Sequence, residues 1–281
     1  MRFFKEFWRV VRYPLLYGAM LVLVQGVLIA ILDAGGADNP IPAEDRLDDM
    51  LVILISALLT LPLIWKFLHK KWKAEGFWTR KQLTPALIAA YTLLGLAFNL
   101  LVNGLIYPSV DLAVTDNPAL LDLLYQVSNP VIFFIATNLA APLIEEVIFR
   151  GIVLERLRKT KMNIWMALII QALIFSAFHT GGVQITYTFF LGIILGLVYL
   201  WSGSVWAAII VHFVFNVMSD VLAAFFSLGN SGVHGLIWVL VALVGLAATI
   251  YLLKYLKRKR VPEVEHIAAV ERTAEGDEQN E

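Results

Sequence analysis

The chain alternates between long apolar segments and shorter polar ones along most of its length. Each apolar segment is about 20 residues long, the length that an α-helix needs to cross the hydrocarbon core of a bilayer. Eight such segments occur, at residues 14–32, 51–68, 83–106, 130 to the basic stretch at 155–161, 162–178, 183–201, 205–226 and 235–253. The pattern therefore predicts an all-α, polytopic membrane protein of about eight transmembrane helices.

Basic and acidic residues are divided unequally between the polar segments. Lys and Arg concentrate in the first 12 residues and after the second, fourth and eighth apolar segments. The segment at 33–49 is acidic, and residues 107–129 hold aspartates without Lys or Arg. Because basic loops stay on the cytoplasmic side of a membrane, both termini are predicted to be cytoplasmic.

The two ends of the chain differ from the apolar part between them. Residues 1–13 mix basic and aromatic side chains, which predicts an amphipathic cytoplasmic lead-in at the membrane surface. The apolar segment at 14–32 is too long for a typical signal-peptide core and is interpreted as a retained helix. Residues 256–281 are first basic and then acidic, which predicts a disordered cytoplasmic tail. The transmembrane domain is accordingly predicted to comprise residues 14–255.

Composition agrees with membrane insertion and excludes several classes of function. Hydrophobic residues make up 59% of the 281 residues and charged residues 16%, against about 25% charged in average soluble domains. The predicted location is therefore an integral, multi-pass membrane protein with the lipid bilayer as a partner. No basic patch stands apart from the membrane-flanking ones, so nucleic-acid binding has no support. The absence of cysteine excludes disulfides, thiolate metal sites and a cysteine nucleophile. No feature specifies an oligomeric state.

Two adjacent glutamates, Glu145 and Glu146, and an arginine, Arg150, interrupt an otherwise apolar run in the sequence AAPLIEEVIFRGIVLE at residues 140–155. A charged residue near the centre of a membrane helix costs roughly 2.5–3.5 kcal/mol, so the pair Glu145 and Glu146 favours a functional role. The alternative is an ion pair that only joins two helices. Glu146 and Arg150 are i,i+4 neighbours that can pair along one helix face. Glu145 lies about 100° round the helix and is not committed to that partner.

Two further apolar segments carry polar side chains. His179 follows Phe175 by four residues near the end of the fifth segment, and His212 precedes Asn216 by four in the seventh. With Glu145, these groups supply a base, a partner for it and neutral hydrogen-bond donors. Such a set can activate a water molecule and stabilise the oxyanion formed when an amide is attacked. Glutamate and histidine are also zinc ligands, and the spacing alone does not decide between the two uses.

The motifs EExxxR (residues 145–150), FxxxH (175–179) and HxxxN (212–216) follow one another on separate apolar segments. In this order they resemble the CPBP family, which contains CAAX prenyl endopeptidases of the Rce1 type and bacteriocin-processing (Abi) intramembrane proteases. The sequence at 189–216 is also similar to the sixth and seventh helices of that family. The resemblance covers a motif-bearing core at about residues 130–220.

The resemblance implies an intramembrane endopeptidase that hydrolyses peptide bonds of membrane-associated or lipidated, CAAX-like peptides or proteins. In this family Glu145 would activate the hydrolytic water and His179 would assist it. His212 and Asn216 would form the oxyanion site. The remaining two motif residues, Glu146 and Arg150, would support the geometry of the helix.

Several alternatives accompany this interpretation. Family members include glutamate-dependent and metal-dependent enzymes. We prefer the former, which requires no cofactor, and a divalent metal such as zinc would otherwise be held by Glu145, His179 and His212. A non-catalytic member could confer self-immunity against a bacteriocin or other peptide toxin. A proton-coupled transporter could use the glutamate and histidine residues as a relay, although the internal repeat that many transporters contain is not evident.

Straight helices would not bring these residues to one depth. At about 1.5 Å per residue, His179 lies about 25 Å above the start of its segment. If the fourth helix continues to about Lys159, Glu145 lies about 21 Å above that end. His212 lies about 12 Å above the start of the seventh segment. One helix is therefore predicted to be tilted, broken or re-entrant, and the break at residues 180–182 is the candidate.

Two further spacings predict helix packing rather than chemistry. Asn99 and Asn103 are i,i+4 neighbours in the third segment and predict an interhelical hydrogen-bond clamp. Gly192 and Gly196 have GxxxG spacing in the sixth segment, which permits close contact with another helix.

Overall fold

The computed structural model describes residues 2–33, 49–74, 78, 83–114, 130–160, 162–227 and 235–261. Within these residues the secondary structure is entirely helical, which confirms the all-α prediction. The elements are α1 (Arg2–Asp33), α2 (Asp49–Ala74), α3 (Pro85–Val114), α5 (Pro130–Phe134), η2 (Ile135–Ala140), α6 (Ala141–Ile148), η3 (Phe149–Leu154), α7 (Glu155–Lys159), α8 (Ile164–Ser176), α9 (Gly182–Ser202), α10 (Val205–Ser227) and α11 (Gly235–Arg258). Most of the acidic segment at 33–49, part of 107–129 and the tail from 262 lie outside the described residues.

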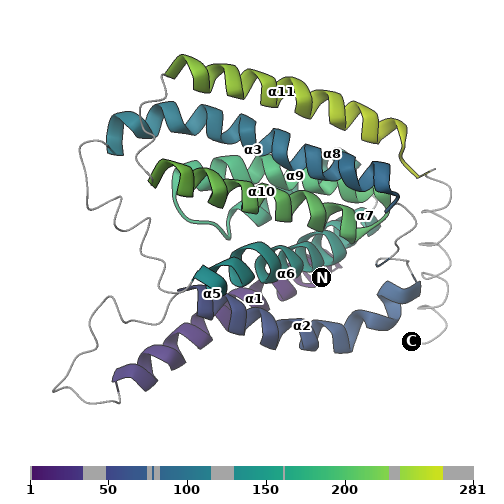
Figure 1. Ribbon diagram of the computed structural model, residues 1–281. Coiled ribbons are helices and arrows are strands. Elements are labelled where there is room, and N and C mark those ends of the chain that lie inside the picture. The colour runs from purple at the N-terminus through teal and green to yellow at the C-terminus, as the bar shows by residue number, and fades with distance from the viewer. Residues whose placement is uncertain are drawn as a thin grey trace.

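The described residues form eight helical segments, because the pieces from α5 to α7 make one continuous run, Pro130–Lys159. Seven of the described helices are long and apolar enough to cross a membrane, and the eighth, α8, is an apolar helix of 13 residues. The protein is therefore an integral, multi-pass membrane protein, as predicted. In Figure 1 successive segments run in alternating directions, so that the beginning of α1 and the end of α11 lie toward the same side. The cytoplasmic orientation of that side stays a prediction.

The helix α8 ends earlier than its apolar sequence suggests. The prediction extended this segment to residue 178, whereas the helix stops at Ser176 and α9 begins at Gly182. The intervening turn contains Gly181 at φ +79°, a left-handed backbone conformation that glycine adopts without strain. At about 1.5 Å per residue α8 spans roughly 20 Å, less than the roughly 30 Å of a hydrocarbon core. The predicted break is thus found here.

Glycines allow α3 and α11 to lie in backbone contact across the bundle. A Cβ atom on Gly104 of α3 would come within 2.6 Å of the Ala242 backbone N, and one on Gly245 of α11 within 2.5 Å of the Leu101 backbone N. Substitution at either position would force the two helices apart. Small residues of this kind are typical of interfaces between membrane helices.

The predicted packing role of the GxxxG spacing in α9 is confirmed. A Cβ atom on Gly192 would lie 3.1 Å from the Cα of Ala172, and one on Gly196 would lie 2.6 Å from Cδ2 of Leu168. Both neighbours belong to α8. Close approach of α8 and α9 places the short helix directly against the GxxxG face.

The predicted asparagine clamp is confirmed for one of its two residues. Asn99 Nδ2 donates to the Phe215 carbonyl at 2.8 Å and to Ser219 Oγ at 2.6 Å, both on α10. Asn103 Nδ2 donates to the Asn99 carbonyl at 3.0 Å, within α3 itself. One asparagine therefore joins α3 to the helix that carries His212, while the other stays within its own helix.

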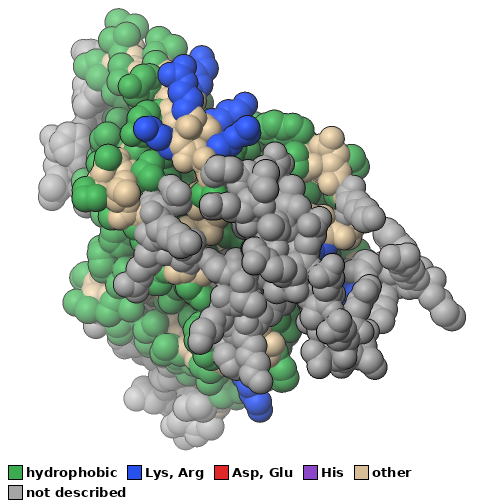
Figure 2. Space-filling model, turned by 90° about the vertical axis from the view of Figure 1, so that its right-hand side faces the viewer, with side chains coloured by type: hydrophobic (Ala, Val, Ile, Leu, Met, Phe, Trp, Pro, Cys, Tyr) green, Lys and Arg blue, Asp and Glu red, His purple; other side chains and the backbone are tan. Residues whose placement is uncertain are grey.

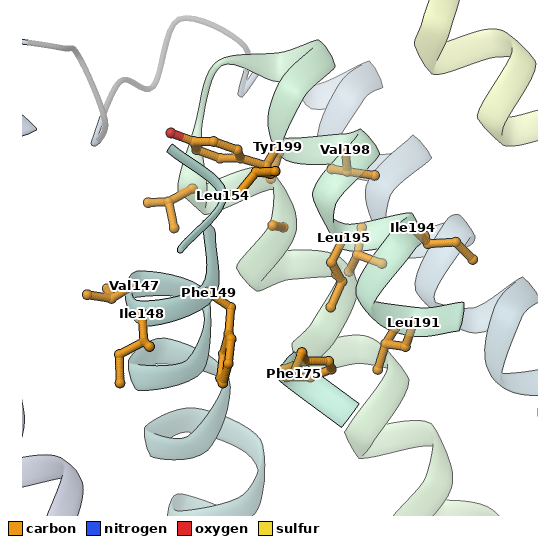
Figure 3. Close-up of a cluster of buried hydrophobic side chains, with 14 of the residues drawn as sticks. Val147, Ile148, Phe149, Leu154, Phe175, Leu191, Ile194, Leu195, Val198 and Tyr199 are labelled. Carbon is orange, nitrogen blue, oxygen red and sulfur yellow. The ribbon is translucent and has the colours of Figure 1, made fainter. Parts of the chain in front are cut away.

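Buried side chains from the run at 130–159, from α8 and from α9 form the core beside these contacts (Figure 3). Phe149 and Phe175 meet edge to face, with ring centroids 5.0 Å apart. Leu191 and Leu195 of α9 are also fully buried in this cluster. The core thus fixes the helix that carries the glutamate pair against α8 and α9.

Candidate active site

The helix that carries the glutamate pair changes register shortly before it. The stretch η2 is a π-helix, and at its end the Ala141 N–H bonds to the Ala136 carbonyl. Pro142 follows and has no N–H to offer. The carbonyl of Thr137 instead accepts a hydrogen bond from Asn216 Nδ2 at 2.8 Å. A change of helix register in this way makes a backbone acceptor available to a side chain of α10, and π-turns are frequent at functional sites.

Glu146 is fully buried and contacts two side chains, Arg150 and His212. Its Oε1 accepts from Arg150 Nη1 at 2.9 Å and lies 2.8 Å from His212 Nδ1. Since an ionised carboxylate only accepts hydrogen bonds, Nδ1 of His212 is the donor in this pair. The ion pair predicted from the i,i+4 spacing is therefore present. The contact with His212 was not predicted from the sequence, because it depends on how α6 packs against α10.

Arg150 has no exposed surface and is held by contacts on three sides. In addition to the ion pair with Glu146, its Nη2 donates to the Gly192 carbonyl at 3.3 Å. The guanidinium carbon lies 4.8 Å from the centre of the Phe175 ring, within the range of a cation–π interaction. Arg150 thereby joins its own helix to α8 and α9.

Glu145 faces a different direction from its neighbour. Its side chain is 17% exposed, and Oε2 lies 3.8 Å from His212 Nε2. The imidazole of His212 is therefore situated between the two carboxylates, with Nδ1 on Glu146 and Nε2 toward Glu145. The separation of the two glutamates that the helical geometry predicted is found in the structure.

The turn after α8 carries the second histidine. His179 Nδ1 lies 3.1 Å from the Phe175 carbonyl, and because a carbonyl can only accept, Nδ1 carries the proton in this hydrogen bond. The His179 ring also meets the Phe175 ring edge to face at 4.9 Å. Phe175 in turn lies edge to face with His212 at 6.0 Å. Phe175, to which the sequence analysis gave no role, therefore contacts one polar residue from each of the three motifs: Arg150, His179 and His212.

A cavity of about 370 Å³ brings the candidate residues together. Such a volume lies within the range of ligand pockets. The four residues proposed to act on a substrate all line it: Glu145, His179, His212 and Asn216. Apolar and aromatic residues of α1 and α2 form another part of its wall, including Tyr17, Leu21, Met50 and Ile53. The candidate site is thus assembled from the helix at 130–159, the turn after α8, and α10, with further walls from α1, α2 and α9.

Asp220 and Asn138 form a polar pair at the cavity that sequence analysis missed. Asn138 Nδ2 donates to Asp220 Oδ2 at 2.7 Å, and Asp220 lines the cavity. The signal was available, because Asp220 is the next i+4 position after Asn216 on α10. Both residues interrupt apolar segments, as the motif residues do.

The donor set was also tested for a metal site. In the part of the chain that the structure describes, no group of three or more His, Asp or Glu side chains is arranged to hold a metal ion. Nδ1 of His179 is directed to a carbonyl and Nδ1 of His212 to Glu146, which leaves Nε2 of both rings available. Because the described side chains form no three-ligand group, we derive no step through a metal.

These observations define a multi-pass membrane protein with a cluster of ionisable residues around an internal cavity. Residues 127–218 match the model of the type II CAAX prenyl endopeptidase, Rce1-like family. The match confirms the resemblance predicted from the three motifs, all of which lie inside it, and it supports a CAAX-type intramembrane protease at the level of the family. No curated protein and no solved structure matches the chain.

Proposed function

We propose that the protein is an intramembrane endopeptidase that hydrolyses a peptide bond in membrane-associated or lipidated, CAAX-like peptides. The observation that carries the proposal is that Glu145, His179, His212 and Asn216 line one cavity within the family-matched residues. A cavity within a helix bundle that contains these polar side chains gives a peptide bond access to a base and to hydrogen-bond donors. The immunity and transporter alternatives gain no comparable support.

In the proposed reaction Glu145 acts as general base. It takes one proton from a water molecule, whose oxygen bonds to the carbonyl carbon of the substrate. The tetrahedral intermediate then collapses as its C–N bond breaks, and the proton passes from Glu145 to the departing nitrogen. His179 assists by orienting the water: with Nδ1–H donating to the Phe175 carbonyl, a neutral ring has Nε2 available as an acceptor.

The proposed oxyanion site consists of Asn216 and His212. One N–H of the Asn216 amide donates to the Thr137 carbonyl, which fixes the amide and leaves its second N–H for the substrate oxygen. His212 donates through Nδ1 to Glu146, so its Nε2 becomes a second donor when the imidazole is protonated. In that form the charges of Glu145, Glu146, Arg150 and His212 sum to zero, which suits a buried cluster.

Glu146 and Arg150 are proposed to be positioning residues. The carboxylate fixes the ring orientation of His212, and Arg150 fixes the carboxylate while it contacts Gly192 and Phe175. Hydrogen bonds of this kind from outside the reacting groups set the orientation and tautomer of a histidine. Together with the contact between Glu146 and His212, the ion pair holds α6 in place against α10.

The proposal is tested with purified protein in proteoliposomes and two synthetic peptides that end in a CAAX sequence, one farnesylated and one unmodified. We expect release of the C-terminal tripeptide, detected by mass spectrometry, with the farnesylated peptide cleaved faster because it partitions into the bilayer. A parallel reaction with a chelator is expected to proceed at the same rate. Folded protein that cleaves neither these peptides nor a set of other membrane-associated peptides would contradict the proposal, and loss of activity on chelation would contradict its metal-independent form.

Asn216→Ala is expected to lower kcat by roughly 10²–10³-fold, the effect of removing one oxyanion donor, with a smaller change in KM. The matched control is Asn103→Ala, which removes the same group from a buried asparagine that bonds within α3 and does not line the cavity. Thermal unfolding of both variants separates lost stability from lost catalysis. Equal kcat values for the two variants would rule out the oxyanion role of Asn216.

A further inference from the structure

A second cavity of about 400 Å³ lies at the opposite end of α9 from the break that precedes it. It is enclosed by the first residues of α8, the last two turns of α9 and the end of α11. A hydrogen bond from the Val261 N–H to the Trp201 carbonyl, 2.9 Å long, holds the end of α11 against the end of α9. This cavity shares no lining residue with the one that contains Glu145, so the two are separate.

The rim of this cavity is basic. Arg158, Lys257 and Arg260 line it, and no Asp or Glu does so among the described residues. Arg158 forms an ion pair with Glu155 at 2.7 Å, whereas Lys257 and Arg260 are exposed. Counting the ion pair as neutral, the rim has a net charge of about +2. Figure 2 looks onto the side at which α11 ends and shows Lys and Arg side chains gathered there.

The walls of the same cavity are apolar and aromatic. Leu168, Leu197 and Leu200 line it, together with Trp165 and Trp201. The indole of Trp165 is 58% exposed and lies one residue after the start of α8. Tryptophan side chains are enriched at the level of the lipid headgroups, where one edge of the ring meets lipid and the other meets water.

A basic rim above apolar walls matches an anionic phospholipid. Lys257 and Arg260 can both contact the phosphodiester, whose single negative charge they more than neutralise, while the leucines and tryptophans contact the first part of the acyl chains. Basic pockets between membrane helices bind anionic lipid headgroups in this way. Inorganic phosphate offers the same negative charge but leaves the apolar walls without a partner. We infer that this cavity is a binding site for one phospholipid with an anionic headgroup, such as phosphatidylglycerol.

The inference is tested by native mass spectrometry of the full-length protein in an uncharged detergent, titrated with phosphatidylglycerol, phosphatidylcholine of the same chain length, or inorganic phosphate. We expect one phosphatidylglycerol to bind more tightly than phosphatidylcholine and inorganic phosphate to bind far more weakly. At about 1 kcal/mol for each basic residue near a lipid headgroup, the double variant Lys257→Gln/Arg260→Gln should bind phosphatidylglycerol roughly 10- to 30-fold more weakly.

The matched control is Arg258→Gln/Lys259→Gln, which removes the same charge from exposed neighbours that do not line the cavity. We expect its affinity for phosphatidylglycerol to change by less than about threefold, because these charges act only through the general surface potential. Equal weakening in both double variants would overturn the inference in favour of diffuse attraction. Equal affinity for phosphatidylglycerol and phosphatidylcholine, or for phosphatidylglycerol and inorganic phosphate, would also overturn it.

Discussion

Replacement of Glu145 by Gln is expected to abolish cleavage while leaving the protein folded. Glutamine has nearly the same shape, and the contact of Glu145 Oε2 with His212 Nε2 is 3.8 Å long, so little stability depends on the charge of Glu145. The amide cannot accept the proton from water. Loss of a general base lowers the rate by roughly 10²–10⁴-fold, which brings tripeptide release in proteoliposomes to near background.

The control for this variant is Glu155→Gln on the same continuous helix. Glu155 pairs with Arg158 at 2.7 Å and does not line the cavity of about 370 Å³, so we expect activity close to that of the unmodified protein. Thermal unfolding should differ little between the two variants. Full cleavage activity in the Glu145→Gln variant would exclude Glu145 as the base and would direct attention to Glu146 or to a non-catalytic function.

Replacement of Glu146 by Ala is expected to be the most destabilising change in the site. The substitution leaves Arg150 with no exposed surface and no carboxylate, and it removes the partner of His212 Nδ1. Breaking a buried ion pair by removing one member costs about 3–5 kcal/mol. The measurement is the free energy of unfolding in mixed micelles, compared with the double variant Glu146→Leu/Arg150→Met.

The double variant separates stability from activity. Replacing both members of a buried ion pair by apolar residues of similar size is often neutral for stability, so the fold should recover substantially. Activity should stay low, because nothing then orients His212. The ion pair of Glu155 and Arg158, whose side chains are 9% and 19% exposed, provides the comparison: Glu155→Ala should cost less than Glu146→Ala, because Arg158 keeps some access to solvent and Arg150 has none. A Glu146→Ala variant as stable as the unmodified protein would refute the structural role of the pair.

Local spacing predicted those parts of the structure that depend on a single helix. Segments of about 20 apolar residues were sufficient to identify the helices, and the i,i+4 spacing was sufficient for the pair of Glu146 and Arg150. The end of α8 was predicted too late, because Ala177 and Phe178 continue the apolar pattern although the helix has ended. Hydropathy measures how strongly side chains favour a nonpolar environment. It does not report the backbone hydrogen bonds that determine where a helix ends.

The contacts between helices were less accessible to sequence reasoning. His212 was grouped with Glu145, but its direct hydrogen-bond partner is Glu146, because the rotation of α10 against α6 follows from packing across the whole bundle. The change to π-helix before Ala141 also escaped prediction. Pro142 was the available signal, since its missing N–H disturbs the preceding turn. Asp220 was overlooked although it continues the spacing of His212 and Asn216.

The short length of α8 bears on how water can reach the candidate site. Non-helical backbone at membrane depth requires partners other than lipid, and it is tolerated where it borders protein or a water-filled space. The turn after α8 satisfies this condition, because His179 and Thr180 line the cavity of about 370 Å³. Because α8 is roughly 10 Å shorter than the hydrocarbon core, we expect water to approach the site through the turn that follows this helix. Water would then reach Glu145 without crossing the full acyl-chain region.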